Sequence, residues 1–177
     1  MYQGTNPAAI LSQRRIAEAM TELLAARPYD AVSVAALCRA AGVSRQTFYS
    51  LFRSRENVIT YLLQMDSRDT TEVFADLDGM LRALCRNFSY YVVRKEPVLR
   101  LLAENDLLDA LRRLLYSSIL RSDYFRGYVR PELQSYTAGY VAAGLTSVAA
   151  EFLCTGADPD TLEEVAYALV RGDIFNK

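Results

Sequence analysis

Apolar residues recur at three- and four-residue spacing along almost the whole chain, and this periodicity constrains the fold more than any other feature. Such spacing places apolar side chains along one face of an α-helix, whereas a half-buried β-strand needs strict alternation, which is missing here. The chain has 177 residues, 51% of them hydrophobic, so it can bury a sizeable core. The sequence therefore predicts an all-α protein of about nine helices.

Capping residues, glycines and prolines set the expected helix boundaries. We expect helices over about 12–26, after Ser33, after Ser44, from 55 into the sixties, over 71–95, over 98–103, from 107 to 121, from 131 to 154 and from 158 onward. Residues 122–130 are expected to form a loop, and Ala41-Gly42-Val43 a tight turn in which Gly42 takes a positive φ.

The segment Val34–Tyr49 holds a short helix, a glycine-containing turn and a second short helix, which is helix-turn-helix spacing. Leu37, Val43 and Phe48 are expected to hold the two helices at a fixed angle. In a helix-turn-helix, the N-terminal part of the second helix faces the major groove of DNA. Since a glycine-turned helix pair also occurs as plain packing, the spacing alone leaves a structural role open.

The side chains on that second helix have the chemistry of DNA recognition. Arg45 can donate two hydrogen bonds to guanine, and Gln46 can pair with adenine in both directions. Hydroxyl and guanidinium groups beside helix N-termini suit phosphate contacts, which set register without reading sequence. The predicted DNA-binding residues are Ser33, Ser44, Arg45, Gln46, Thr47, Tyr49 and Arg55.

The charge distribution also indicates a nucleic-acid partner. Residues 12–55 carry seven arginines against Glu18, Glu22 and Asp30, a net charge of +4, which leaves −5 for the rest of a chain whose total is −1. Such asymmetry between segments is typical of nucleic-acid-binding proteins.

The residue inventory argues against catalysis and metal binding. The chain has no histidine, and its cysteines, Cys38, Cys85 and Cys154, form no CxxC pair, so we expect no metal, no cofactor and buried, reduced thiols. An enzyme would need carboxylates, but Glu104, Asp106 and Asp109 have the pattern of a solvated helix end. We expect no enzymatic activity.

We expect the protein in the cytoplasm, because the N-terminus lacks the pattern of a signal peptide. Leu133–Ala150 carries no charge, but its serines, threonines, glycines and alanines favour a helix buried between other helices over one that crosses a membrane.

Over residues 12–62 the chain resembles the TetR/AcrR transcriptional regulators. The matching residues are Arg15-Ile16, Leu23-Leu24, Tyr29 through Val34, Ala40 through Ser44, Thr47-Phe48-Tyr49, Phe52, Arg55-Glu56 and Val58-Ile59. There are two departures: Leu51 stands where the family often has a phosphate-contacting His or Tyr, and Arg55 stands where Lys is usual. The resemblance implies a TetR-like fold, with a three-helix helix-turn-helix domain over 1–62 and a larger helical domain for dimerisation and effector binding over 63–177.

The resemblance further implies a homodimer formed by the last two helices. The stretch from Ala138 to Ala150 permits it, since its small residues let helix backbones approach closely, although internal packing would explain them too. Glu151-Phe152-Leu153, Gly156 and Asp158-Pro159 more loosely resemble a short subgroup that includes the dihydroxyacetone kinase regulators, in which Trp is common at the position of Phe152. That subgroup includes an activator that acts with a protein partner.

In the TetR family the middle helices usually enclose a small-molecule effector. Aromatic residues that suit a pocket or an ordinary core are Phe74, Phe88, Tyr90, Tyr91, Tyr116, Tyr124, Phe125, Tyr128, Tyr136 and Tyr140. The sequence thus predicts a sequence-specific regulator that binds double-stranded DNA as a homodimer and represses until a ligand releases it. The alternatives are an activator, or a protein-interaction module that uses the same fold with a protein partner.

Overall fold

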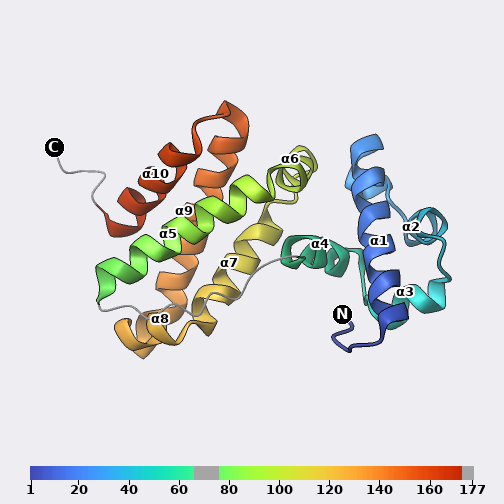
Figure 1. Cartoon of the computed structure of the whole chain (residues 1–177), viewed down its shortest axis with the longest axis horizontal. Helices are drawn as coiled ribbons and strands as arrows, with labels where there is room; N and C mark the ends of the chain where they lie inside the picture. The colour runs from blue at the N-terminus through green and yellow to red at the C-terminus, as the bar shows by residue number, and fades with distance from the viewer. Residues whose placement is uncertain (66–75, 173–177) are drawn as a thin grey trace. The chain divides into compact units, whose positions relative to one another are not determined.

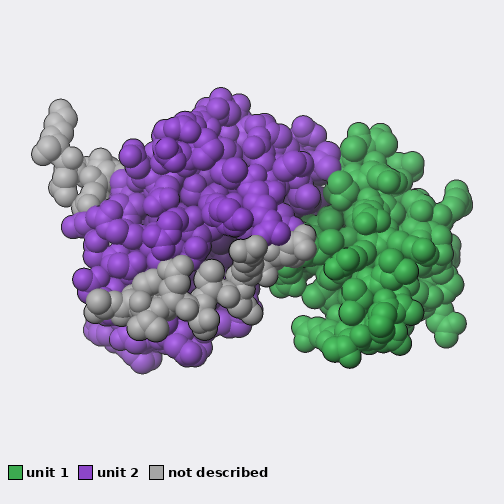
Figure 2. Space-filling model, viewed as in Figure 1, with its two compact units in different colours: residues 1–66 green, residues 67–177 purple. Residues whose placement is uncertain are grey.

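The computed structural model describes residues 1–65 and 76–172, and in these ranges the chain forms helices and no strands. The all-α prediction is therefore confirmed. The chain divides into two compact units, Met1–Asp66 (unit 1) and Ser67–Lys177 (unit 2), drawn in different colours in Figure 2. The functions that we assigned to 1–62 and 63–177 stay predictions.

Unit 1 is a small helical domain. Its elements are α1 (Pro7–Ala26), the 3₁₀ turn η1 (Tyr29–Ala31), α2 (Val34–Ala41), α3 (Arg45–Leu51) and α4 (Arg55–Gln64), shown in blue to green in Figure 1. α1 packs against α2, α3 and α4. The side chains that fill its core are Ile16, Met20, Val32, Leu37, Phe48, Phe52, Ile59 and Leu63, each at most 2% exposed.

α1 begins five residues before the predicted start at 12. The carboxamide oxygen of Asn6 accepts from the Ala8 amide at 3.0 Å, and Pro7 occupies the first turn, so the helix starts with a side-chain cap. The first turn is largely exposed, which is why apolar periodicity did not reveal it.

Unit 2 is a larger helical bundle. Its elements are α5 (Leu77–Arg94), α6 (Glu96–Glu104), α7 (Asp109–Arg121), α8 (Asp123–Tyr128), η2 (Pro131–Leu133), α9 (Gln134–Thr155) and α10 (Pro159–Arg171). α5 packs against α10, and α9 packs against both α7 and α10. The helix that we predicted from 71 is described from Leu77, since residues 71–75 lie outside the described ranges.

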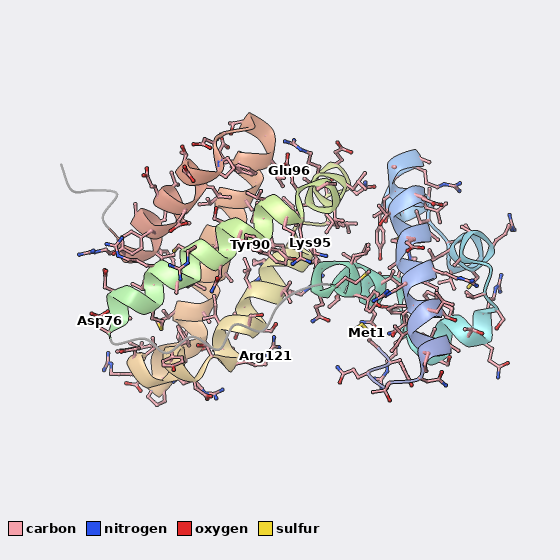
Figure 3. The ribbon with its side chains drawn as sticks, in the orientation of Figure 1. Met1, Asp76, Tyr90, Lys95, Glu96 and Arg121 are labelled. Atoms are coloured by element: carbon pink, nitrogen blue, oxygen red, sulfur yellow. The ribbon has the colours of Figure 1, made fainter. Side chains whose placement is uncertain are left out.

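The predicted interruption at Glu96-Pro97 is confirmed. Lys95 ends α5 and Glu96 begins α6, as the labels in Figure 3 show, and Pro97 lies in the first turn, where its missing N–H is not needed.

The predicted loop at 122–130 is wrong, because this segment contains α8. The Ser122 hydroxyl accepts from the Phe125 amide at 3.3 Å, and Phe125 is only 7% exposed. One cap and one buried ring hold a six-residue helix that is too short to show helical periodicity.

α9 is the uncharged helix considered above. Together with η2 it is the one described helix long and apolar enough to cross a membrane, with 44% of the apolar window buried. That is weak evidence of a membrane span, since the core helix of a water-exposed bundle has the same length and composition. As predicted, α9 packs between other helices, and its Ala138, Ala142, Leu145 and Ala149 are at most 1% exposed.

Candidate nucleic-acid interface

The turn between α2 and α3 has the geometry that the sequence predicted. Gly42 ends α2 with φ +65° and ψ +35°, in the left-handed region that favours glycine. The Val43 amide then donates to the Cys38 carbonyl at 3.0 Å, which closes the turn. The chain thus enters α3 three residues after leaving α2.

One side of α3 is fixed in the core of unit 1. Phe48 is fully buried and Leu51 is 4% exposed, and the fully buried Leu37 lies on α2, which packs against α3. Val43 is half-buried. The predicted apolar lock between the two helices is therefore present. The burial of Leu51 turns it away from solvent, where a phosphate-contacting residue would have to reach.

The other side of α3 is open to solvent. Arg45, Gln46 and Tyr49 are exposed, Tyr49 to 56%, and the Tyr49 ring meets the Phe48 ring edge-on at 5.3 Å. The two predicted base-reading side chains thus lie on the first turn of a helix whose opposite face cannot move without disrupting the core.

Two of the predicted hydroxyl residues, Ser33 and Ser44, are helix N-caps. Ser44 Oγ accepts from the Thr47 amide at 3.0 Å and lies 2.9 Å from Thr47 Oγ1, so both hydroxyls lie at the start of α3. Ser33 Oγ accepts from the Ala36 amide at 3.1 Å and starts α2. Both serines are exposed. A hydroxyl at a helix N-terminus lies beside orphan backbone amides, which favours a nearby anion.

Arg55 differs from the other predicted residues, because its guanidinium turns inward. Its Nη1 donates to the Tyr29 carbonyl at 2.9 Å and to the Val32 carbonyl, and its guanidinium carbon lies 4.4 Å from the centre of the Tyr29 ring. The structure therefore brings Arg55 to the segment before α2 rather than to the open side of α3.

The arginines of the two units differ in how often they pair with a carboxylate. In the described part of unit 2, arginines that pair with carboxylates include Arg82, Arg100, Arg112, Arg113, Arg126, Arg130 and Arg171. In residues 1–65, the arginines that are exposed and have no side-chain partner within the described structure are Arg14, Arg15, Arg27, Arg39, Arg45 and Arg53. Uncompensated positive charge of this kind attracts a phosphate backbone.

Arg39 and Arg53 were missed by the predicted set. Arg39 is the basic residue of the last turn of α2, and Arg53 follows Phe52, the C-cap of α3, so exposed cations lie on both sides of that helix in the sequence. The arginine count of residues 12–55 already included these two residues. Their exposure, which the sequence does not give, distinguishes them from the half-buried Arg55.

The three cysteines lie in the described part of the chain. Cys38 and Cys85 are buried and Cys154 is exposed, all three as free thiols. Burial raises the pKa of Cys85 to about 12 and also raises that of Cys38, which keeps both thiols protonated. Within the described ranges, no group of three or more His, Cys, Asp or Glu side chains could hold a metal ion.

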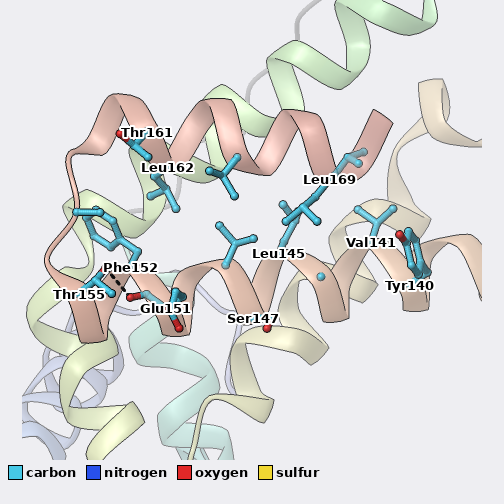
Figure 4. A pocket seen from close by; sticks show the side chains of 15 residues that line it. Tyr140, Val141, Leu145, Ser147, Glu151, Phe152, Thr155, Thr161, Leu162 and Leu169 are labelled. Carbon is cyan, nitrogen blue, oxygen red and sulfur yellow. Dashed lines mark hydrogen bonds between the residues drawn. The ribbon is translucent and has the colours of Figure 1, made fainter. Parts of the chain in front are cut away.

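A cavity of about 580 Å³ lies between α9 and α10 (Figure 4). Its lining is mainly apolar, with Leu145, Phe152 and Leu162 as large members and Glu151 as the carboxylate. Of the aromatic residues that we grouped as suited to a pocket, Tyr140 lines this cavity, whereas Phe88 and Phe125 are core residues at 3% and 7% exposure.

Comparison with known proteins agrees with this geometry. Residues 16–62 match the family model described as bacterial regulatory proteins, tetR family. Over 175 residues the chain is 25% identical to the HTH-type dhaKLM operon transcriptional activator DhaS of Lactococcus lactis subsp. lactis (strain IL1403), covering 92% of this chain and 89% of DhaS. Residues 16–62 are therefore a DNA-binding domain of the TetR type. The chain is a DNA-binding transcriptional regulator, and its relatives are regulators rather than enzymes.

Other relatives of this regulator match in part or in fold. The HTH-type transcriptional regulator AlkX of Mycobacterium tuberculosis (strain ATCC 25618 / H37Rv) is 39% identical over 65 residues, which is 36% of this chain and 31% of AlkX. The crystal structure of Lin0861 from Listeria innocua superposes with a TM-score of 0.73 at 17% identity, covering 97% of this chain and 96% of Lin0861, which shows a shared fold.

Proposed function

We propose that this regulator binds a specific double-stranded DNA site, with α3 in the major groove. The observation that carries the proposal is the division of α3 into a buried side, Phe48 and Leu51, and an exposed first turn with Arg45 and Gln46. Each bidentate contact of such side chains with the correct base discriminates by about 1–3 kcal/mol. The phosphate contacts that we assign to this surface come from Ser33, Ser44, Thr47 and Tyr49.

We further propose that two copies bind together through α9 and α10. Tyr140 and Val165 line the apolar cavity of Figure 4 and are 67% and 42% exposed, so the apolar lining continues onto the surface of α9 and α10. A contiguous exposed apolar patch is typical of a protein–protein interaction site. A Cβ at Gly144 would meet nothing within 4 Å, so this face of α9 is open in a single chain. A homodimer would present two copies of α3 to the two halves of a near-palindromic site.

Control by a small molecule requires a ligand that changes the affinity of the proposed dimer for DNA. A ligand can release DNA only if it binds one arrangement of the two DNA-binding domains better than the other. We propose repression in the cytoplasm that a small molecule relieves. The alternative, activation, is favoured by the similarity to DhaS along nearly the whole chain, since DhaS is named a transcriptional activator. Transcription from the upstream DNA of the protein's own gene, with and without the protein, distinguishes the two.

The experiment that tests DNA recognition is titration of the protein with that upstream DNA at two salt concentrations. The Arg45→Ala, Gln46→Ala double variant is the comparison. Arg27→Ala is the control for the loss of one positive charge, which lowers affinity for any DNA but not the preference for one site, because Arg27 is exposed just after α1 and outside the helix-turn-helix. We expect the wild type and the control to select one site and the double variant to lose that preference. If no DNA is bound better than at about micromolar Kd in low salt, the interaction-module alternative replaces the proposal.

A further inference from the structure

The first two residues of α4 hold the segment that leads into α2. The guanidinium of Arg55 donates to the backbone carbonyl of Tyr29 and stacks on the face of the Tyr29 ring, as described above. Glu56 contacts the same tyrosine: the Tyr29 hydroxyl donates to Glu56 Oε1 at 2.9 Å. Tyr29 lies 26 and 27 positions before these two residues, so the contact joins α4 to a distant part of the chain.

Val32 connects this contact to the DNA-binding helices. Its side chain is fully buried, its carbonyl accepts from Arg55, and the next residue is Ser33, whose hydroxyl caps α2. We infer that Arg55 is a positioning residue that fixes the Tyr29–Ser33 segment, and with it the start of α2, against α4, instead of contacting a DNA phosphate. The inference rests on the proposed DNA binding and replaces the phosphate role that the sequence predicted for Arg55.

The chemistry of the contact favours this role. An arginine that donates to carbonyls in a partly buried site forms strong, charge-assisted hydrogen bonds, and its planar group stacks on an aromatic ring. Reaching a phosphate would break these bonds and leave the Val32 carbonyl without its cationic donor. The carboxylate of Glu56 is also adjacent, and the hydrogen bond from Ser54 keeps its pKa below the usual range, so its negative charge opposes a phosphate at this place.

Arg53 provides the matched control. It lies two residues before Arg55 and is exposed, and its guanidinium has no partner within residues 1–65 or 76–172. Arg53→Ala removes the same charge from the same turn and leaves the contact with Tyr29 intact. A difference between Arg53→Ala and Arg55→Ala therefore isolates the contact from the charge.

The experiment combines hydrogen exchange of the free protein with DNA titration over a range of salt. In Arg55→Ala we expect exchange of the Val32, Ala36 and Leu37 amides, all hydrogen-bonded in this segment, to rise about tenfold or more, while the α3 amide of Phe48 is unchanged. DNA affinity should fall about tenfold, with the slope of log K against log salt altered less than in Arg53→Ala. Arg53→Ala should leave the exchange as in the wild type.

The opposite pattern overturns the inference. If Arg55→Ala leaves the exchange of this segment unchanged and makes the salt slope shallower by about 0.9 for each bound copy, then Arg55 contacts a phosphate directly. If Arg55→Ala fails to fold, Arg55→Lys replaces it in both measurements, because it keeps the charge without the planar guanidinium. Hydrogen exchange in Arg55→Lys that equals the wild-type exchange also counts against the inference. If the wild type binds no DNA, the proposed function fails, but the exchange experiment still tests the contact.

Discussion

Gly42→Ala should destabilise unit 1 by an amount that follows from the backbone alone. Gly42 has φ +65°, and a Cβ added there would meet no atom within 4 Å, so the substitution introduces strain without a steric clash. The left-handed conformation costs a residue with a Cβ about 1–2 kcal/mol. Loss of glycine's freedom in the unfolded chain offsets about 0.4–1 kcal/mol. The net loss in free energy of unfolding is therefore about 1 kcal/mol, or about 4–8 °C in Tm for a unit of this size.

The assay is urea unfolding with hydrogen exchange of the amides in residues 1–65 as the readout. This readout separates the free energy of unfolding of unit 1 from that of unit 2. Two controls are available. Gly42→Asn should recover most of the loss, because Asn tolerates the left-handed region. Gly156→Ala has φ +64° and equally open space, so it should cost the same amount in unit 2 and leave unit 1 unchanged. The reasoning is refuted if Gly42→Ala has wild-type stability, or if Gly42→Asn is the less stable of the two.

Other residues give shorter predictions. Ser44→Ala removes the cap of α3 and should lower the free energy of unfolding by about 1 kcal/mol in thermal denaturation. Ser44→Asp should keep the wild-type stability but lose DNA affinity, so equal DNA affinity of the two variants would contradict the proposed surface. Val165→Asp puts a charge beside the α9–α10 cavity and should give a folded monomer in sedimentation, so a persistent dimer would exclude this interface. Iodoacetamide at pH 8 should label Cys154 and spare Cys85, as read by mass spectrometry of the folded protein. Because burial raises the folded pKa of Cys85 to about 12, its stabilising contribution is complete below the unfolded value of about 8.5 and declines as pH rises toward 12, which urea unfolding at pH 8 and pH 10.5 checks.

The sequence predicted the helix-turn-helix because its signals are local. The Gly42 turn, the serine caps and the buried Phe48 each depend on a few neighbouring residues, and all of them agree. The fold class followed in the same way from periodicity, which accumulates over long helices such as α5 and α9. Short helices lack that signal, which is why α8 was predicted as a loop.

The role of Arg55 was beyond sequence reasoning for a different reason. Its partners, Tyr29 and Val32, lie more than twenty positions away, and a basic residue at a helix start has the same local pattern whether it faces solvent or the protein. Several ion pairs of unit 2, such as that of Arg82 with Asp78, join residues three or four positions apart and follow a local pattern, whereas Arg171 pairs with Asp78 across 93 positions. Three-dimensional proximity decides these assignments.

The interleaving of buried and exposed residues on α3 has a consequence for how such a regulator changes over generations. Stability depends on Phe48 and Leu51, while Arg45, Gln46 and Tyr49 project into solvent. Substitutions at exposed positions usually alter the free energy of unfolding by no more than about 0.5 kcal/mol. If Arg45 and Gln46 read the bases as proposed, a duplicated gene can therefore acquire a new target site by mutating these two surface positions while the domain stays folded at every intermediate step.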